Sequence, residues 1–176
     1  ESDRLTGMVE ELLDFSRFTS GRISLVKDMI DIKETLKTVV YQMMPRAINN
    51  NIDFNVNIDD EIAPILGDEN RIRQVLINLL DNAFKFTGEG EVSLSAYEEG
   101  EELIIQIRDN GPGIPQDELP YIKDKFYKGK NSQSHSGIGL SICEEIMGLH
   151  GGTFRIESQL EVGTVVTVGF PREVSQ

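Results

Sequence analysis

Apolar residues in this chain switch repeatedly between the spacing of a helix and the spacing of a strand, and this switching restricts the folds open to it. Residues 92–96 alternate apolar with polar side chains, and after an EEGEE turn Leu103, Ile105 and Ile107 are again apolar at every second position. Such alternation predicts two strands, each with one buried face, joined as an antiparallel hairpin. Hairpins mixed with helices predict an α+β fold, with a mixed, mostly antiparallel sheet covered by helices on one face.

The other expected elements follow the same two periods. Asp68 is a suitable N-cap for a helix over 68–86, and Gly151 with Gly152 is suited to end a helix over 139–149. A further helix is expected from about Asp31 to Ile48, and strands are expected over 52–58, 154–157 and 164–170. The 176 residues suffice for one such domain and a short extension.

The extension is an amphipathic helix that we expect to end at Thr19-Ser20-Gly21. Its apolar residues recur at spacings of three and four, as in a coiled-coil seam. This spacing fits a partner helix, and it fits packing on the chain's own domain equally well. The seam consists of Leu5, Met8, Leu12 and Phe15, and Val9 and Leu13 widen it.

Composition excludes some classes of function and compartment. The formal net charge of -13 argues against general nucleic-acid binding, because an acidic surface repels phosphate backbones. Cys143 is the single cysteine, so no intramolecular disulfide can form, and a cytoplasmic location is expected. The sequence has neither a membrane-length apolar run nor a signal peptide. Because it starts ESDRL, without Met, we expect a fragment of a protein that is membrane-anchored or soluble.

The helix over 68–86 carries polar side chains along one face, at spacings of three, four, four and three. Asparagine is a poor helix former, so two asparagines one turn apart reduce stability without an evident structural gain. Carboxamide oxygens beside a lysine suit a Mg²⁺ ion that takes its other ligands from water and phosphate. A solvated surface is the alternative. The face consists of Arg71, Gln74, Asn78, Asn82 and Lys85.

Two glycine-containing segments are candidate nucleotide contacts. The segment DNGPGIP places Asp109 at a strand end, where a carboxylate can accept a hydrogen bond from an exocyclic amine such as that of adenine. Gly111 and Gly113 after it would let the backbone approach a flat ring or adopt positive φ, and a plain turn is the alternative. Gly137 and Gly139 precede a helix, whose unpaired N–H groups can bind phosphate.

Between these segments lies a polar stretch with several lysines, Lys123, Lys125, Lys128 and Lys130. A lid that closes over phosphates would use such cations, and an ordinary loop is the alternative.

Taken in order, NLLDNAFKFT, DNGPGIP, KDKFYKG, GIGLSI and VGT resemble the N, G1, F, G2 and G3 boxes of the ATP-binding catalytic domain of sensor histidine kinases. LLDFSRFTSGR resembles the end of the family's dimerisation helix. The resemblance implies a two-layer α/β sandwich of the GHKL (Bergerat) type, with three main helices on one face plus the N-terminal helix. It divides the chain into a helix tail, 1–24, and a catalytic domain, 25–176, with a lid over about 115–136.

The resemblance also implies a set of site residues and two cofactors, ATP and Mg²⁺. Asn78, Asn82 and Lys85 correspond to the catalytic residues, and Asn82 to the metal ligand. The chain departs from the pattern at Lys128, where the family often has arginine. The remaining positions that correspond to nucleotide contacts are Asp109, Gly111, Gly113, Phe126, Lys128, Lys130, Gly137, Ile138, Gly139, Leu140 and Thr164.

Asn78 bears on the reaction type, because hydrolytic relatives of this superfamily have a glutamate base at the matching position. A carboxamide does not take up a proton at neutral pH, so the resemblance implies transfer to an outside histidine rather than to water. We expect that histidine upstream of Glu1, since neither His135 nor His150 has the context of a phosphoacceptor.

The implied partners are the chain's own dimerisation domain in a homodimer and a response regulator receiver domain, with no nucleic acid. Two alternatives remain open: a serine kinase of the anti-sigma type, and a nucleotide-binding interaction module without transfer.

Overall fold

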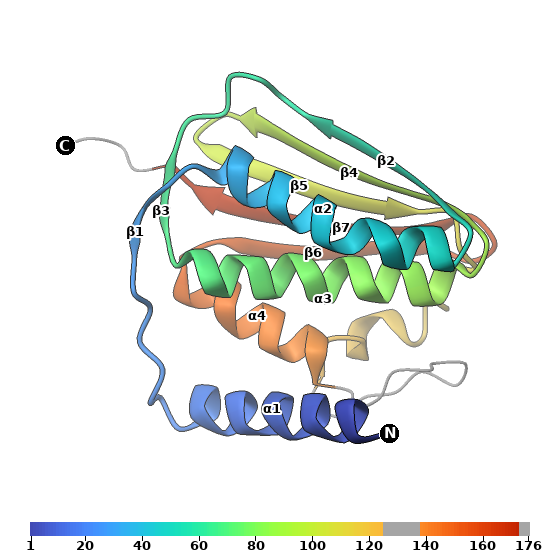
Figure 1. Cartoon of the computed structure of the whole chain (residues 1–176), viewed down its shortest axis with the longest axis horizontal. Coiled ribbons are helices and arrows are strands. Elements are labelled where there is room, and N and C mark those ends of the chain that lie inside the picture. The colour runs from blue at the N-terminus through green and yellow to red at the C-terminus, as the bar shows by residue number, and fades with distance from the viewer. Residues whose placement is uncertain (125–137, 173–176) are drawn as a thin grey trace.

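The computed structural model describes residues 1–124 and 138–172, and its body is a two-layer sandwich (Figure 1). A five-stranded sheet forms one layer, and three helices cover one of its faces, as the sequence predicts. The strands, in spatial order, are β2 (Ile52–Ile58), β4 (Gly90–Glu99), β5 (Glu102–Asp109), β7 (Gly163–Pro171) and β6 (Thr153–Gln159). The helices are α2 (Ile32–Asn49), α3 (Glu69–Thr87) and α4 (Gly139–Leu149).

The sheet is mixed and mostly antiparallel, which confirms the predicted fold class. β4 and β5 form the expected hairpin, and β5–β7 and β6–β7 are also antiparallel. β2 pairs with β4 in parallel, and the crossover between these two strands contains α3. β2 and β6 are therefore the edges of the sheet.

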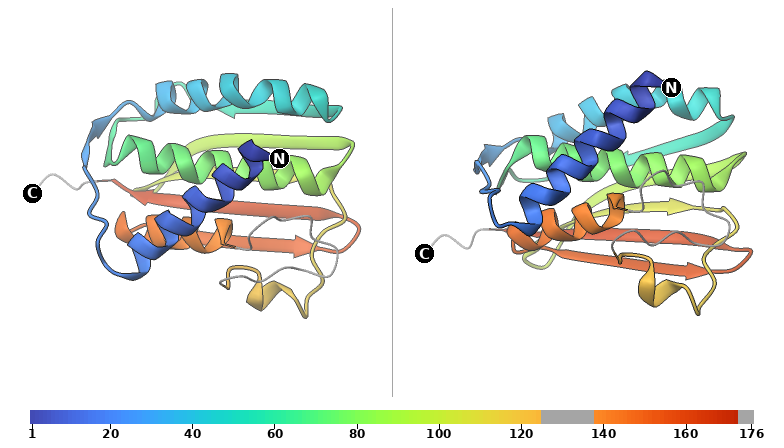
Figure 2. Two further views of the ribbon diagram at one scale, coloured as in Figure 1. Left: turned by 60° about the horizontal axis from the view of Figure 1, so that its bottom comes forward. Right: turned by 90° about the horizontal axis from the view of Figure 1, so that it is seen from below.

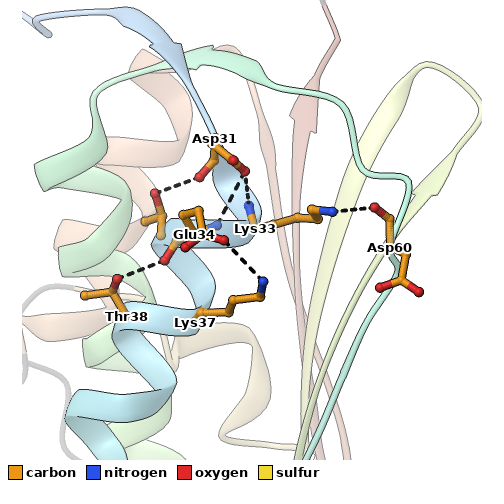
Figure 3. Close-up of polar contacts among 7 residues, drawn as sticks. Asp31, Lys33, Glu34, Lys37, Thr38 and Asp60 are labelled. Carbon is orange, nitrogen blue, oxygen red and sulfur yellow. Dashed lines mark hydrogen bonds and ion pairs between the residues drawn. The ribbon is translucent and has the colours of Figure 1, made fainter.

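Side-chain caps fix where two of the helices begin. The Asp31 carboxylate accepts hydrogen bonds from the backbone N–H groups of Lys33 and Glu34, at 3.2 and 3.4 Å, at the start of α2 (Figure 3). The Asp68 carboxylate accepts from the N–H of Arg71 at 3.2 Å and starts α3 as predicted. An N-cap of this kind satisfies donors that the first helical turn leaves without partners.

The apolar face of α3 forms the centre of the core between helices and sheet. Its side chains pack above the inward-facing residues of β4 and β5, which include Leu94 and Ile105. Burying this face drives the folding of the domain, since removal of apolar area from water is the dominant favourable contribution. The buried residues of α3 on this face are Ile72, Val75, Leu76, Leu79, Leu80 and Ala83, all of them predicted.

Three short elements were not predicted. β1 (Asp28–Ile30) pairs antiparallel with β3 (Ile65–Gly67), and Leu119–Tyr121 form a 3₁₀ helix, η1. Segments of three residues carry too few positions for a period to be recognised, so the sequence pattern gave no signal for them.

The N-terminal helix α1 (Ser2–Thr19) ends at the predicted Thr19-Ser20-Gly21 and crosses the domain beside α4 (Figure 2). One side of it packs on the domain, where Phe18 is buried and Met8 and Phe15 are half-buried. The predicted seam is therefore divided, with Leu5 and Leu12 exposed on the other side together with Val9 and Leu13. No helix in the described part of the chain has both the length and the apolar composition that crossing a lipid bilayer requires.

Candidate nucleotide-binding site

Three predicted parts of the site lie at one end of the sandwich. β5 ends there with Asp109, the C-terminal half of α3 lies over that end, and α4 begins there (Figure 1). A Cβ added to Gly111 would lie 3.1 Å from the Cα atom of Thr87, so the segment after β5 touches the last turn of α3. The fold thus brings together residues of α3, β5 and α4, which lie far apart in the sequence.

Asp109 is a half-buried carboxylate on the helix-facing side of the sheet, the side on which Ile105 and Ile107 enter the core. Its Oδ1 atom accepts a hydrogen bond from the backbone N–H of Gly111 at 3.0 Å. Burial raises the pKa of this carboxyl above its ordinary value, and hydrogen bonds from the N–H groups of Gly111 and Thr164 offset only part of that rise. No cationic side chain pairs with it in the part of the chain that the structure describes, so its desolvation is only partly compensated.

Two hydroxyl groups extend this polar position across the neighbouring strands. Thr164 on β7 lies directly opposite Asp109, and Ser158 on β6 lies opposite Thr164. The Ser158 and Thr164 hydroxyl oxygens are 2.8 Å apart, and Ser158 Oγ also accepts from the N–H of Ile114 at 2.7 Å. Thr164 was predicted and Ser158 was not, although its place across a hairpin from Thr164 would have identified it.

The glycines near Asp109 allow the chain to approach itself closely. Gly163 has φ +140°, and a Cβ there would collide with the Asp109 carbonyl oxygen. Gly113 has φ +75°, and a Cβ there would collide with the Gln159 carbonyl oxygen. The positive φ expected at Gly113 is therefore present, and the close approach that it and Gly111 permit is to the protein's own backbone.

The polar face of α3 is divided between two environments. Arg71 and Gln74 contact α1, because Arg71 Nη1 and Gln74 Nε2 lie 3.3 and 3.1 Å from Asp14 Oδ2. Arg71 also lies over the Phe18 ring, 5.2 Å from its centroid. These two residues were predicted to share the polar face with Asn78 and Asn82, and in the structure they hold the N-terminal helix.

The C-terminal part of the same face is less occupied. The Nδ2 atom of Asn78 lies 3.9 Å from the buried sulfur of Cys143 on α4, a weak contact. Asn82 is half-buried, and its amide makes no hydrogen bond to another described residue. Lys85 pairs with Asp81 at 2.9 Å, and Asp81 also pairs with Arg46 of α2 at 2.9 Å.

The residue at the N-cap position of α4 has an apolar side chain. This residue, Ile138, is fully buried and makes no side-chain capping hydrogen bond. A Cβ added to Gly139 would meet no atom within 4 Å in the described structure, and Leu140 packs against the core. Phe126, Lys128, Lys130 and Gly137 lie outside the described residues, as do Lys125 and His135.

The first part of the predicted lid, residues 115–124, is bound to the edge of the sheet. Lys123 Nζ donates to the Phe154 carbonyl oxygen at 3.1 Å and pairs with Glu144 at 2.9 Å. Gln116 Nε2 donates to the Ser158 carbonyl oxygen at 2.8 Å. Lys123, one of the four lysines grouped in this stretch, is thus used to cover β6, and the rest of the predicted lid lies outside the described residues.

His150 is buried and neutral. Its Nδ1 lies 2.8 Å from the Ile146 carbonyl oxygen, and its Nε2 accepts a hydrogen bond from the backbone N–H of Asp68 at 3.0 Å. Burial is the main cause of a pKa below the ordinary histidine value. With both ring nitrogens engaged, His150 joins the end of α4 to the start of α3.

A groove of about 410 Å³ lies at the same end of the sheet, bordered by Asp109 and Thr164. Most of its lining comes from the face opposite the helices, as the register of Asn55, Ser93 and Arg108 shows. Neither Asn78 nor Asn82 lines this groove, so it is separate from the side on which the predicted nucleotide residues converge.

Comparisons with known proteins agree with this architecture. The family model for histidine kinase-, DNA gyrase B- and HSP90-like ATPases matches residues 67–174. The chain is 35% identical over 178 residues to the signal transduction histidine-protein kinase AfsQ2 of Streptomyces coelicolor, covering 99% of this chain and 32% of the relative. It is 34% identical over 173 residues to the sensor protein KdpD of Escherichia coli, covering 97% of this chain and 19% of the relative. The chain therefore spans a third or less of these relatives.

Solved structures give the same result. Full-length ShkA in complex with AMPPNP superposes with a TM-score of 0.87 at 30% identity, over 98% of this chain and 37% of that one. The histidine kinase ThkA in complex with the response regulator protein TrrA superposes with a TM-score of 0.76 at 29% identity, over 98% and 48%. The chain belongs to the family of histidine kinase-, DNA gyrase B- and HSP90-like ATPases, and it is similar to the catalytic ATP-binding domain of sensor histidine kinases.

Proposed function

We propose that the domain binds ATP with Mg²⁺ and transfers the γ-phosphoryl group to a histidine of a dimerisation domain in two-component signalling. The observation that carries this proposal is Asp109, a half-buried carboxylate at a strand end that has backbone donors but no cationic partner among the described residues. A protein gains nothing structurally from a carboxylate whose desolvation is only partly offset. A ligand that brings a hydrogen-bond donor would complete it.

Adenine supplies such a donor in its exocyclic amine, which Asp109 would accept while the Thr164 hydroxyl lies beside it on β7. Guanine carries a carbonyl oxygen at the corresponding position and would face the carboxylate with a lone pair. The site should therefore prefer adenine nucleotides. Placing the base at Asp109 directs the phosphates toward the C-terminal half of α3 and the start of α4, because both lie at this end of the sheet (Figure 1).

Asn82 fits the role of the metal-holding residue. Its half-buried amide has no protein partner among the described residues, and no cluster of three or more His, Cys, Asp or Glu occurs among them to hold a metal without the substrate. Mg²⁺ often keeps several water ligands and takes the rest from phosphates and one or two protein oxygens. When bound, the ion would neutralise charge on the phosphate oxygens.

The chain's own residues act by binding and positioning. Asn78 cannot accept a proton from water at neutral pH, so ATP would remain intact until the acceptor histidine arrives. Backbone N–H groups in the first turn of α4, at Gly139 and Leu140, would donate to phosphate oxygens, and Ile138 precedes that turn. Lys85 reaches the phosphates only if it leaves Asp81, its partner in this structure.

The partners follow from the exposed surface of α1 and from the relatives. We propose that residues 1–24 continue a dimerisation helix and that residues 25–176 form the catalytic domain. The exposed side of α1, with Leu5 and Leu12, would pack in the helical bundle of a homodimer. A response regulator would take the phosphoryl group from the histidine, as the complex of ThkA with its response regulator protein suggests by analogy. We place these reactions in the cytoplasm.

The proposal is tested by titrating Mg-ATP into the chain and supplying a separate histidine-bearing helical hairpin with radiolabelled ATP. Asn82→Ala should weaken Mg-ATP binding and abolish transfer, whereas Asn57→Ala, on the far edge strand, should leave both unchanged. Unaltered transfer by Asn82→Ala would remove this residue from the site. Phosphate that is stable in acid would favour the serine kinase, and binding without transfer would favour the interaction module.

A further inference from the structure

The two edge strands of the sheet differ in how far other residues cover their outward backbone groups. At β6, Lys123 and Gln116 donate to the outward carbonyl oxygens of Phe154 and Ser158, at 3.1 and 2.8 Å, so side chains occupy that edge. At β2 no described residue does the same, and no element lies beyond this strand at the upper boundary of Figure 1. Exposed edge strands are templates for pairing with another strand, and proteins normally protect them.

The free backbone groups of β2 can be assigned from its pairing. The Asp59 N–H donates to the Ala96 carbonyl oxygen of β4 at 3.0 Å, which continues the parallel ladder past the strand end. Residues of the same parity, such as Asn55 and Asn57, therefore direct their N–H and C=O groups toward β4. The alternate residues Phe54 and Val56 direct theirs outward.

The sequence of β2, IDFNVNI, lacks most of the usual protections of an edge. It has no lysine, proline or glycine, and it pairs with β4 over all seven residues without a bulge. Its outer-face side chains, Asp53, Asn55 and Asn57, are exposed and carry one charge between them.

Helix α2 carries an apolar flank on the same side of the molecule. Thr35 and Arg46 contact Glu69 and Asp81 of α3, at 3.1 and 2.9 Å, so one flank of α2 faces α3. The opposite flank begins at Lys33, which donates to the Asp60 carbonyl oxygen just after β2 (Figure 3). One helical turn and more beyond Lys33, this flank holds Val40, Tyr41, Met44 and Ile48, of which Tyr41 is 85% and Ile48 66% exposed.

We propose that the edge of β2 and this flank of α2 bind a second copy of the chain through antiparallel β2–β2 pairing. A two-fold axis normal to the sheet would join the two sheets into one and keep the helices of both copies on the same face. The α2 flanks would then border the seam from both sides. A single symmetry operation thus covers the unpaired backbone groups and the exposed apolar side chains.

Side-chain charge selects the register. If Asn55 lies opposite Asn55 of the second copy, Asp53 lies opposite Asn57, a pair that can hydrogen-bond, and Phe54 lies opposite Val56. A register centred on Val56 would oppose Asp53 with Asp59, two carboxylates, which is unfavourable. A register centred on Phe54 would leave Ile58 beyond the end of the partner strand and lose ladder hydrogen bonds. The Asn55-centred register is thus the self-complementary one, and self-complementarity favours a second copy over an unrelated extended peptide.

A cysteine substitution tests both the interface and its register. Asn55 does not exchange backbone hydrogen bonds across the seam, and Cα atoms in such pairs are about 4.5 Å apart, which suits a disulfide. The native Cys143 is fully buried and will not compete. Asn55→Cys, oxidised with glutathione disulfide under native conditions, should form a covalent dimer that does not form in urea.

Matched variants control for random collisions. Asn57→Cys alone and Asp53→Cys alone should form no covalent dimer under the same conditions. Their equimolar mixture should cross-link, because position 57 of one copy faces position 53 of the other. Equal cross-linking of Asn55→Cys and Asn57→Cys would overturn the proposal.

Charge variants test the non-covalent association by analytical ultracentrifugation, in buffer without nucleotide, so the outcome is separate from ATP binding. Asn55→Lys opposes lysine with lysine and should abolish the dimer formed through β2, whereas Asn57→Lys opposes Asp53 and should retain it. Association that is equally strong in both variants would place the contact elsewhere, on the exposed side of α1 for example, and would refute the β2 interface.

Discussion

Replacing Asp109 by asparagine tests whether its carboxylate serves ligand binding or the stability of the fold. The asparagine oxygen can still accept the N–H of Gly111, which lies 3.0 Å from Oδ1 in the native protein. The substitution removes the charge and little else. It also exposes an approaching adenine amine to a carboxamide, which accepts a weaker hydrogen bond or opposes it with its own N–H₂ group.

The magnitude for ligand binding follows from the charge-assisted hydrogen bond that is lost. Such bonds contribute about 1.5 to 3 kcal/mol, so the dissociation constant for Mg-ATP should rise by about 10- to 150-fold. Discrimination between adenine and guanine nucleotides should fall with it, since guanine bound in the same orientation presents a carbonyl oxygen where adenine presents its amine.

The effect on stability has the opposite sign. Burial raises the pKa of Asp109 in the folded state above its ordinary value, so the unfolded chain loses this proton at lower pH than the folded chain does. The carboxylate therefore reduces stability once the pH exceeds the ordinary value of about 3.9, and the full reduction is reached above the folded-state pKa. At neutral pH the nucleotide-free Asp109→Asn variant should be at least as stable as the native chain.

Thermal unfolding at neutral pH with and without Mg-ATP measures both effects, and calorimetric titration gives the affinities. The exposed Asp117→Asn is the matched control, because it removes one carboxylate without touching the site. A variant that loses stability but keeps its affinity for Mg-ATP would refute the reasoning and make Asp109 a structural residue.

Three further substitutions or conditions follow from the contacts. Asp14→Ala should lower the free energy of unfolding by about 0.5 to 1.5 kcal/mol in urea titrations, because α1 loses its half-exposed polar contacts with α3. Stability should fall as the pH decreases from about 6.5 toward the lower folded-state pKa of His150, because the unfolded chain takes up that proton first; urea midpoints between pH 8 and 5 will show this, with a smaller change in His150→Gln. Gly163→Ala should cost about 1 to 3 kcal/mol in thermal unfolding and weaken Mg-ATP binding, because a Cβ at φ +140° collides with the Asp109 carbonyl oxygen.

Two of these substitutions have matched controls that make the same chemical change at an exposed or open position. Asp3→Ala removes an exposed carboxylate from the same helix as Asp14, and Gly148→Ala adds a Cβ that meets no atom within 4 Å. Equal effects of Asp14→Ala and Asp3→Ala would mean that the contact with α3 contributes nothing. A pH profile that is identical in the native chain and His150→Gln would assign the acid sensitivity to other groups.

The long elements could be predicted because each repeats its period many times. α3 spans 19 residues and shows its buried face plainly, whereas β1 and β3, with three residues each, cannot. The N-cap Asp68 could be predicted because the interaction is local: its carboxylate and the N–H group of Arg71 that it accepts from are three residues apart. Pairing between distant segments was predictable only where a hairpin or a known arrangement of boxes implied it.

The residue types of the site could be predicted from the sequence. Which of these residues contact other parts of the protein, and which stay available to a ligand, could not. Arg71, Gln74, Asn78 and Asn82 form one helical face in the sequence, yet the structure assigns the first two to Asp14 of α1. Periodicity fixes which side chains share a face, and tertiary contacts decide which of them remain available to a ligand. Ser158 was missed because the expected strand ended at residue 157, one position before the residue that lies opposite Thr164.

Polar groups that find protein partners and polar groups that do not are therefore informative in opposite ways. Arg71 and Gln74 are satisfied by one carboxylate, so they account for how α1 is held and need no ligand. Asn82 has no partner among the described residues, and Asp109 has only backbone donors, although both positions reduce stability, one by helix propensity and the other by desolvation. Their convergence at one end of the sheet, near the start of α4, is what a binding site for a nucleotide requires and what stability alone would not select.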